Sequence, residues 1–110
     1  MVKKIIYVDI DDTICNTPYI NNSILEKDYI NSTPIYENIE FINKLYDDGH
    51  YVIYWTARGT VTKKDWRIVT ENQFKKWNVK YHELKFGKPY YDLFIDDKNI
   101  NAKDLKNIAL

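Results

Sequence analysis

The chain has 110 residues, a length that predicts one domain, spanning 1–110, with a single hydrophobic core. A hydrophobic content of 45% favours a packed globule over a disordered chain, and 16 basic residues balance 16 acidic ones. This balance gives no reason to expect nucleic acid or a membrane surface as a partner. The single cysteine excludes an intramolecular disulfide, and no stretch approaches the ~20 apolar residues of a membrane span. The N-terminal run is not a signal peptide, so we expect a cytoplasmic protein.

The first predicted element is a strand over residues 4–10 that runs into a cluster of acidic side chains. Side chains alternate along an extended chain, so Asp9 and Asp11 point the same way. Two carboxylates ~4 Å apart repel by about 4 kcal/mol at an effective dielectric of about 20. A raised pKa or a bound cation is needed to offset this repulsion.

Residues 14–33 form the one long polar stretch without clear periodicity, and we expect a functional or mobile flap there. The following segment, "TPIYENIEFINKLYDDG", predicts a helix with Thr33 as its N-cap and Pro34 at its first position. Apolar residues recur on one face of this helix, and Gly49 is expected to end it.

A second strand is predicted over residues 51–56, and it ends in the polar sequence Thr56–Arg58. Arg58 follows Thr56 closely enough to reach the leaving group of a substrate; the alternative is a solvent-exposed arginine. The segment "KKDWRIVTENQFKKWNV" (63–79) then predicts a second helix with an apolar stripe that includes Trp66, Phe74 and Trp77.

The remaining strands are predicted over residues 79–84 and 92–96, with Lys88 in a tight loop between them. The last strand ends at Asp96 and Asp97. A short C-terminal helix is expected to use Ala102, Leu105 and Ala109, and His82 is expected to pack or to cap near a strand end.

Strands that alternate with helices predict an α/β fold, a Rossmann-like three-layer sandwich with a mostly parallel sheet and helices on both faces. Ligands of such sheets bind beyond the carboxyl ends of the strands. If the first and last strands are neighbours, Asp9, Asp11 and Asp96 meet at one edge of the sheet. Carboxylate oxygens without histidine suit Mg²⁺ better than zinc.

Mg²⁺ held by few carboxylates commonly binds phosphate oxygens as well, which points to a phosphorylated substrate. Asp9 lies nearest the strand and is the candidate nucleophile that forms an aspartyl-phosphate. Asp11 would protonate the leaving oxygen and later activate water. Thr56 and Lys88 would bind the phosphoryl group, and Lys88 and the metal would stabilise its charge.

These motifs resemble the haloacid dehalogenase (HAD) superfamily of phosphohydrolases. Its hydrophobic strand followed by D-x-D-x-T is similar to "YVDIDDT" (7–13), its strand-end threonine to "VIYWTAR" (52–58), and its acidic pair to "FIDD" (94–97), with Lys88 between the last two. The resemblance covers nearly the whole chain. It implies phosphomonoester hydrolysis, with Asp9, the main-chain carbonyl of Asp11 and Asp96 binding Mg²⁺. Thr13 and Arg58 join Thr56 and Lys88 as phosphate-binding candidates; Asp97 is either a further metal ligand or a helix cap.

Within that superfamily, residues 76–98 resemble short bacterial proteins of capsule and surface-polysaccharide synthesis, which implies a small phosphorylated sugar, polyol or amino alcohol as substrate. No inserted cap domain fits in 110 residues. Three alternatives therefore stay open for the cleft: a neighbouring copy of the chain covers it, the substrate is large, or residues 14–33 form a modest flap.

Three other functions were weighed against a phosphatase. A phospho-accepting signalling module has its acidic pair first and its lysine last, whereas here the lysine precedes a closing acidic pair. A phosphomutase or phosphotransferase needs a way to exclude water. The intact motifs argue against a partner-dependent subunit with little turnover of its own.

Overall fold

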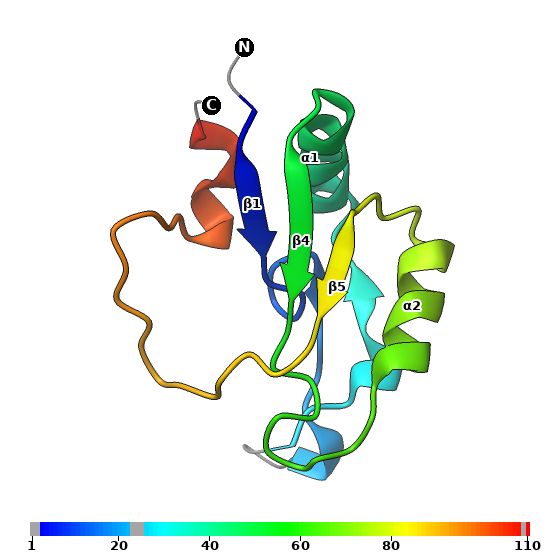
Figure 1. Ribbon diagram of the computed structural model, residues 1–110. Helices are drawn as coiled ribbons and strands as arrows, with labels where there is room; N and C mark the ends of the chain where they lie inside the picture. The colour runs from blue at the N-terminus through cyan, green and yellow to red at the C-terminus, as the bar shows by residue number, and fades with distance from the viewer. Residues whose placement is uncertain (1–2, 23–25, 109) are drawn as a thin grey trace.

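The structure of the protein is a computed structural model, and it describes residues 3–22, 26–108 and 110. Strands and helices alternate through most of the chain (Figure 1). The elements are β1 (Ile5–Val8), β2 (Cys15–Asn16), the 3-10 helices η1 (Ile20–Asn22) and η2 (Tyr29–Asn31), β3 (Thr33–Pro34), α1 (Tyr36–Asp47), β4 (Tyr51–Trp55), α2 (Arg67–Lys76), β5 (Glu83–Lys85) and the 3-10 helix η3 (Ala102–Asn107).

A three-stranded parallel sheet forms the centre of the fold, in the order β1, β4, β5. Because successive strands are parallel, each is followed by a crossover, through α1 between β1 and β4 and through α2 between β4 and β5. The prediction of an α/β fold with a parallel sheet is thereby confirmed. The short strands β2 and β3 pair separately in antiparallel fashion.

Helix α1 begins two residues later than predicted. Thr33 and Pro34 pair with β2 as strand β3, so they are not available as N-cap and first helical residue. Ile35 occupies the N-cap position without a side-chain hydrogen bond. The predicted end is confirmed, because Gly49 follows the helix with a φ of +96°, a conformation that glycine adopts without strain.

The hydrophobic core lies between the sheet and the two long helices. Apolar positions of α1 recur at helical spacing, and α2 adds Phe74, whose ring meets the ring of Tyr54 edge-on. His82 packs as expected near a strand end, where its ring stacks on Tyr46 and Tyr51. The buried apolar residues are Val8, Ile10, Ile14, Cys15, Ile39, Ile42, Leu45, Val52, Tyr54, Phe74, Trp77, Val79, Leu84 and Leu105.

The predicted strand over 92–96 is not formed in this structure. The chain from β5 to η3 forms a wide loop that swings away from the sheet (Figure 1). Leu93 and Ile95 within it are 75% and 88% exposed. The predicted strand over 79–84 is shifted as well, because β5 covers only Glu83–Lys85. Among the described residues, β1 pairs with β4 alone, so one edge of β1 has no strand beside it.

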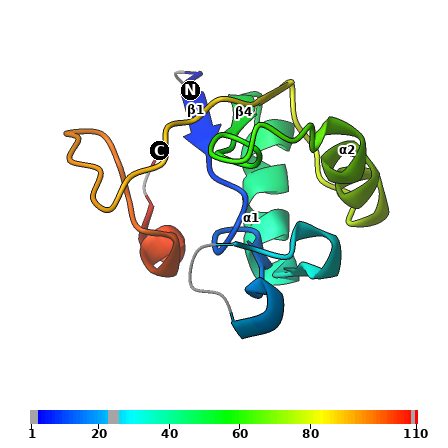
Figure 2. The ribbon, with the colours of Figure 1, turned by 90° about the horizontal axis from the view of Figure 1, so that it is seen from below.

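The helices are gathered on one side of the sheet. Seen from below, α1, α2 and η3 all lie on the same side of β1 and β4 (Figure 2). On the other side, Ile5, Tyr7 and Tyr51 are exposed. The three-layer sandwich with helices on both faces therefore stays a prediction.

Some expectations fall on residues outside those the structure describes. These are residues 23–25 within the expected flap and Ala109 of the C-terminal helix; the rest of that helix is the 3-10 helix η3. Within the described ranges, no helix combines the length and the apolar character that a membrane crossing requires.

Candidate active site

Asp9 lies directly after β1, where it contacts two of the residues that the sequence predicts to act with it. The Nζ atom of Lys88 is 3.4 Å from Oδ1 of Asp9, and the hydroxyl of Thr13 donates a hydrogen bond of 3.4 Å to Oδ2. Lys88 is only 13% exposed and lies against the rings of Trp55 and Tyr91. Carboxylate, ammonium and hydroxyl groups thus meet at one strand end, and the ammonium group comes from a distant part of the chain.

The environment of Asp9 raises the pKa of its carboxyl group above the ordinary value. Burial is the largest cause, because it disfavours the charged form. The positive charge of Lys88 acts in the opposite direction, and the negative charge of Asp11 adds to the increase. Asp9 is therefore a partly desolvated carboxylate whose main electrostatic support in the described chain is Lys88.

Thr56 lies at the carboxyl end of β4, next to Asp9 in the sheet order. Its buried hydroxyl accepts a hydrogen bond from the main-chain N–H of Arg58, and its carbonyl accepts one from the N–H of Lys88. The loop that follows is tight: a Cβ atom on Gly59, whose φ is +81°, would lie 2.1 Å from the carbonyl oxygen of Lys64. The loop after β4 therefore holds Thr56 and the main chain of Lys88 together.

Asp11 does not share the position of Asp9; it faces the interior and pairs with Arg58. The Nη2 and Nε atoms of Arg58 donate hydrogen bonds of 2.9 and 3.1 Å to Oδ1 and Oδ2 of Asp11. The hydroxyl of Thr17 donates a third, of 2.6 Å, to Oδ1. The Arg58 side chain is fully buried, so it is not the solvent-exposed arginine that was the alternative reading.

The sequence did not reveal the rest of the surroundings of Arg58. Its Nη1 donates to Thr70 and Gln73 of α2, and its guanidinium lies 4.9 Å from the ring centroid of Tyr29 in the flap. One signal was present in the sequence, because Thr70 falls on the apolar stripe of the predicted second helix. A polar residue at such a position calls for a buried partner.

The expected flap, residues 14–33, contacts this centre at several points. The hydroxyl of Thr17 donates to Asp11, and Nη2 of Arg58 donates to Ser32, which also shares a 2.8 Å hydrogen bond with Thr17 inside the flap. Lys27 forms an ion pair of 2.5 Å with Asp12, which adopts a left-handed φ of 64°. The described part of the flap therefore packs against the loop after β1.

Asp96 and Asp97 lie in the exposed loop, apart from the other acidic residues. Oδ1 of Asp96 accepts a hydrogen bond from the N–H of Asp97, and its carbonyl accepts one from Asn99. In the part of the chain that the structure describes, no three histidine, cysteine, aspartate or glutamate residues lie together as metal ligands. The described arrangement does not fit the predicted Mg²⁺ site.

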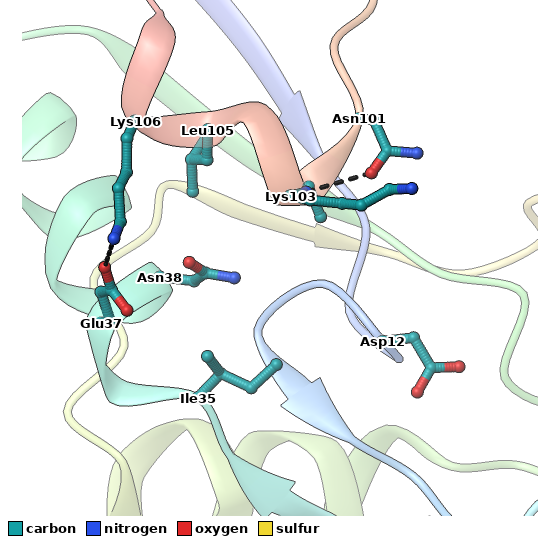
Figure 3. Close-up of a pocket in the computed structure, with 9 residues that line it drawn as sticks. Asp12, Ile35, Glu37, Asn38, Asn101, Lys103, Leu105 and Lys106 are labelled. Carbon is teal, nitrogen blue, oxygen red and sulfur yellow. Dashed lines mark hydrogen bonds and ion pairs between the residues drawn. The ribbon is translucent and has the colours of Figure 1, made fainter.

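Among the described residues, two cavities near the strand ends can be named, and Asp9 lines neither of these two. The larger of the two, about 540 Å³, is a partly open hollow bordered by the loop after β1, the start of α1 and η3 (Figure 3). In that view Asp12, Asn38 and Lys103 border the space. The second, about 380 Å³, is lined by Arg58, Lys63, Lys64 and Gly87, beside the loop that carries Thr56.

Comparison with protein-family models finds no match, and comparison with curated proteins finds none either. Among solved structures, the fold is similar to the crystal structure of an MCSG target from Vibrio cholerae, with a TM-score of 0.76 and 27% sequence identity. The alignment covers 99% of this chain and 91% of that one. The similarity supports the α/β architecture over nearly the whole chain.

Proposed function

We propose that the protein is a phosphomonoester hydrolase of the HAD type that acts through an aspartyl-phosphate on Asp9. The contact between Asp9 and Lys88 carries the proposal. A carboxylate at a strand end, with an ammonium group and a hydroxyl in contact, suits nucleophilic attack on a phosphoryl group whose negative charge must be stabilised. Thr56 at the neighbouring strand end supplies a second hydroxyl.

The reaction would proceed in two steps. In the first, a carboxylate oxygen of Asp9 forms a bond to phosphorus while the bond to the leaving oxygen breaks, and Asp11 gives that oxygen a proton. In the second, Asp11 takes a proton from water, whose oxygen attacks phosphorus and displaces Asp9. Lys88 and Thr56 would hold the non-bridging phosphoryl oxygens in both steps.

The same proposal includes a fourth strand in the sheet. We propose that residues 92–96 join the sheet as a strand beside the free edge of β1, as in a Rossmann-like sandwich. The exposure of Leu93 and Ile95 supports this, as does the length of a loop that is uncommon in compact domains. Asp96 and Asp97 would then reach the edge that carries Asp9.

In that arrangement Asp9, Asp96, Asp97 and the main-chain carbonyl of Asp11 are the groups that would hold Mg²⁺. The carboxylate of Asp11 is already paired with Arg58, which leaves its carbonyl as the available oxygen. When bound, Mg²⁺ would stabilise negative charge on the transferring phosphoryl group.

The proposed substrate is a small phosphorylated sugar, polyol or amino alcohol, and the proposed setting is the cytoplasmic synthesis of capsule or surface-polysaccharide precursors. Both rest on the resemblance of residues 76–98. The described flap supports a cover supplied by the chain itself, because Lys27 and Thr17 connect it to Asp12 and Asp11 in the loop after β1. A neighbouring copy of the chain is the alternative cover.

The deciding experiment measures phosphate release from a panel of phosphorylated sugars, polyols, amino alcohols and nucleotides, with and without Mg²⁺. We expect Mg²⁺-dependent release, and we expect Asp9→Asn to lower it by at least about 1,000-fold, because the nucleophile is lost. Asp47→Asn is the matched control, since Asp47 pairs with Lys80 on the surface, and it should retain full activity.

Full activity of a folded Asp9→Asn variant would overturn the mechanism. No release from any substrate by the folded wild type would favour the second candidate, a phospho-accepting or partner-dependent subunit. One observation favours that candidate: the carboxylate of Asp11 faces the interior, where it pairs with the fully buried Arg58.

A further inference from the structure

The side chain of Arg58 points into the interior of the protein. It is fully buried, and its donors are directed at groups from three parts of the fold. These groups are Asp11 after β1, Ser32 in the flap, and Thr70 and Gln73 on α2. An arginine whose donors are already used by interior acceptors contributes little to binding an incoming anion.

The geometry at Asp11 is specific. A guanidinium that donates to both carboxylate oxygens fixes the plane of the carboxylate as well as its position. Oδ1 also accepts from Thr17, whereas Oδ2 accepts from Nε of Arg58 alone among the described contacts. Each carboxylate oxygen has two lone pairs, so Oδ2 keeps one lone pair for a proton.

We propose that Arg58 is a positioning residue for Asp11: its fork holds the carboxylate so that Oδ2 carries the proton to the leaving oxygen. The proposal rests on the proposed function, in which Asp11 is the acid and base. It replaces the phosphate-binding role that the sequence suggests for Arg58. It also connects the flap to the chemistry, because Gln73 bonds both to Arg58 and to the carbonyl of Tyr29.

A positioning role predicts dependence on the leaving group. An alkyl phosphate expels a strongly basic oxygen that needs a proton, whereas p-nitrophenyl phosphate expels a phenolate that leaves without one. In Arg58→Lys we expect kcat/KM for an alkyl phosphate to fall by about 10- to 100-fold, because this constant reports the steps up to departure of the leaving group. For p-nitrophenyl phosphate kcat/KM should stay within about 3-fold; kcat is not the readout, because Asp11 also serves as base in the second step, which both substrates share. A phosphate ligand would affect both substrates alike.

Two further variants keep the test decisive. Thr17→Val removes one hydroxyl donor to Asp11 without removing a charge, so a folded protein is expected even if Arg58→Lys unfolds, with the same selective loss. In the Asp11→Asn background, Arg58→Lys should cause no additional loss, because the group on which it acts is gone. Arg67→Lys, at a half-exposed arginine of α2, is the control and should leave both substrates unaffected.

Equal losses on the two substrates, or an additional loss in the double variant, would overturn the role of Arg58. Failure of the wild type to hydrolyse either substrate would instead reject the proposed function. The two failures are therefore distinguishable in one set of measurements.

Discussion

The surroundings of Arg58 and the loop between β5 and η3 both carry polar residues near strand ends, but they differ in how many long-range contacts those residues make. Around Arg58, a buried charge meets acceptors from the β1 loop, the flap and α2. In the loop, apolar Leu93 and Ile95 are exposed, and Asp96 bonds only to its own neighbours in the described chain. The polar groups around Arg58 are paired through long-range contacts, whereas Asp96 in the loop makes none among the described residues.

The difference shows which part of the candidate site is held by long-range contacts. Asp9, Lys88 and Asp11 are held in the described arrangement, whereas the acidic residues that a metal would need lie in the loop.

The largest effect on stability is expected at the buried ion pair between Arg58 and Asp11. Arg58→Met should lower the free energy of unfolding by about 3–5 kcal/mol, because it leaves the Asp11 carboxylate in the interior without its ionic partner. Urea unfolding followed by circular dichroism measures this value.

The matched control is Arg67→Met, which removes a half-exposed arginine paired with Glu71 at 3.9 Å. It should cost less than about 1 kcal/mol. Similar losses for Arg58→Met and Arg67→Met would mean that the interior of the β1 loop tolerates an unpaired charge, and the contrast between the two regions would disappear.

The sequence predicted what local patterns determine. Alternation and strand length indicated β1 and β4, and polar residues at their ends indicated Asp9 and Thr56. The contact of Lys88 with Asp9 was not predicted as such: the sequence indicated Lys88 as a phosphate-binding residue in a tight loop, and the structure brings that loop to the end of β1.

Two features depended on long-range pairing and were not predictable in the same way. The partner of Arg58 could not be chosen from the sequence, because 47 residues separate it from Asp11. For residues 92–96 the local pattern is that of a strand, but pairing with β1 must close a loop of some 80 residues, an entropic cost that no local pattern reveals. Among the described residues, no strand pairs with β1 other than β4.

The variant Ile95→Asp tests whether the exposed loop between β5 and η3 becomes part of the sheet. If residues 92–96 join β1 in the presence of Mg²⁺, Ile95 becomes buried, and Ile95→Asp should lower stability by about 2–3 kcal/mol. Ile30→Asp, at an isoleucine of η2 that is 66% exposed, should stay within about 0.5 kcal/mol of the wild type. Urea unfolding with Mg²⁺ compares the two, and equally small effects would mean that the loop stays outside the sheet.

The smallest effect is expected at Tyr54, an exception to the well-partnered interior. Its hydroxyl is buried and has no hydrogen-bond partner among the described residues, and burial raises the pKa of its phenol above the ordinary value. Tyr54→Phe should therefore leave stability at pH 7 unchanged or raise it by about 1 kcal/mol.

The pH dependence of stability, compared between Tyr54→Phe and the wild type, tests whether the buried phenol is the cause of the difference. The folded chain keeps the proton on Tyr54 above pH 10, where the unfolded chain with an ordinary pKa of about 10 releases it, so unfolding becomes easier as pH rises through this range. Tyr54→Phe lacks this loss, and the other tyrosines titrate in both proteins. The stability difference between variant and wild type should therefore widen in urea unfolding at about pH 10.5 compared with pH 7. A constant difference, or a variant that is clearly less stable at pH 7, would indicate that the hydroxyl has a hydrogen-bond partner in solution.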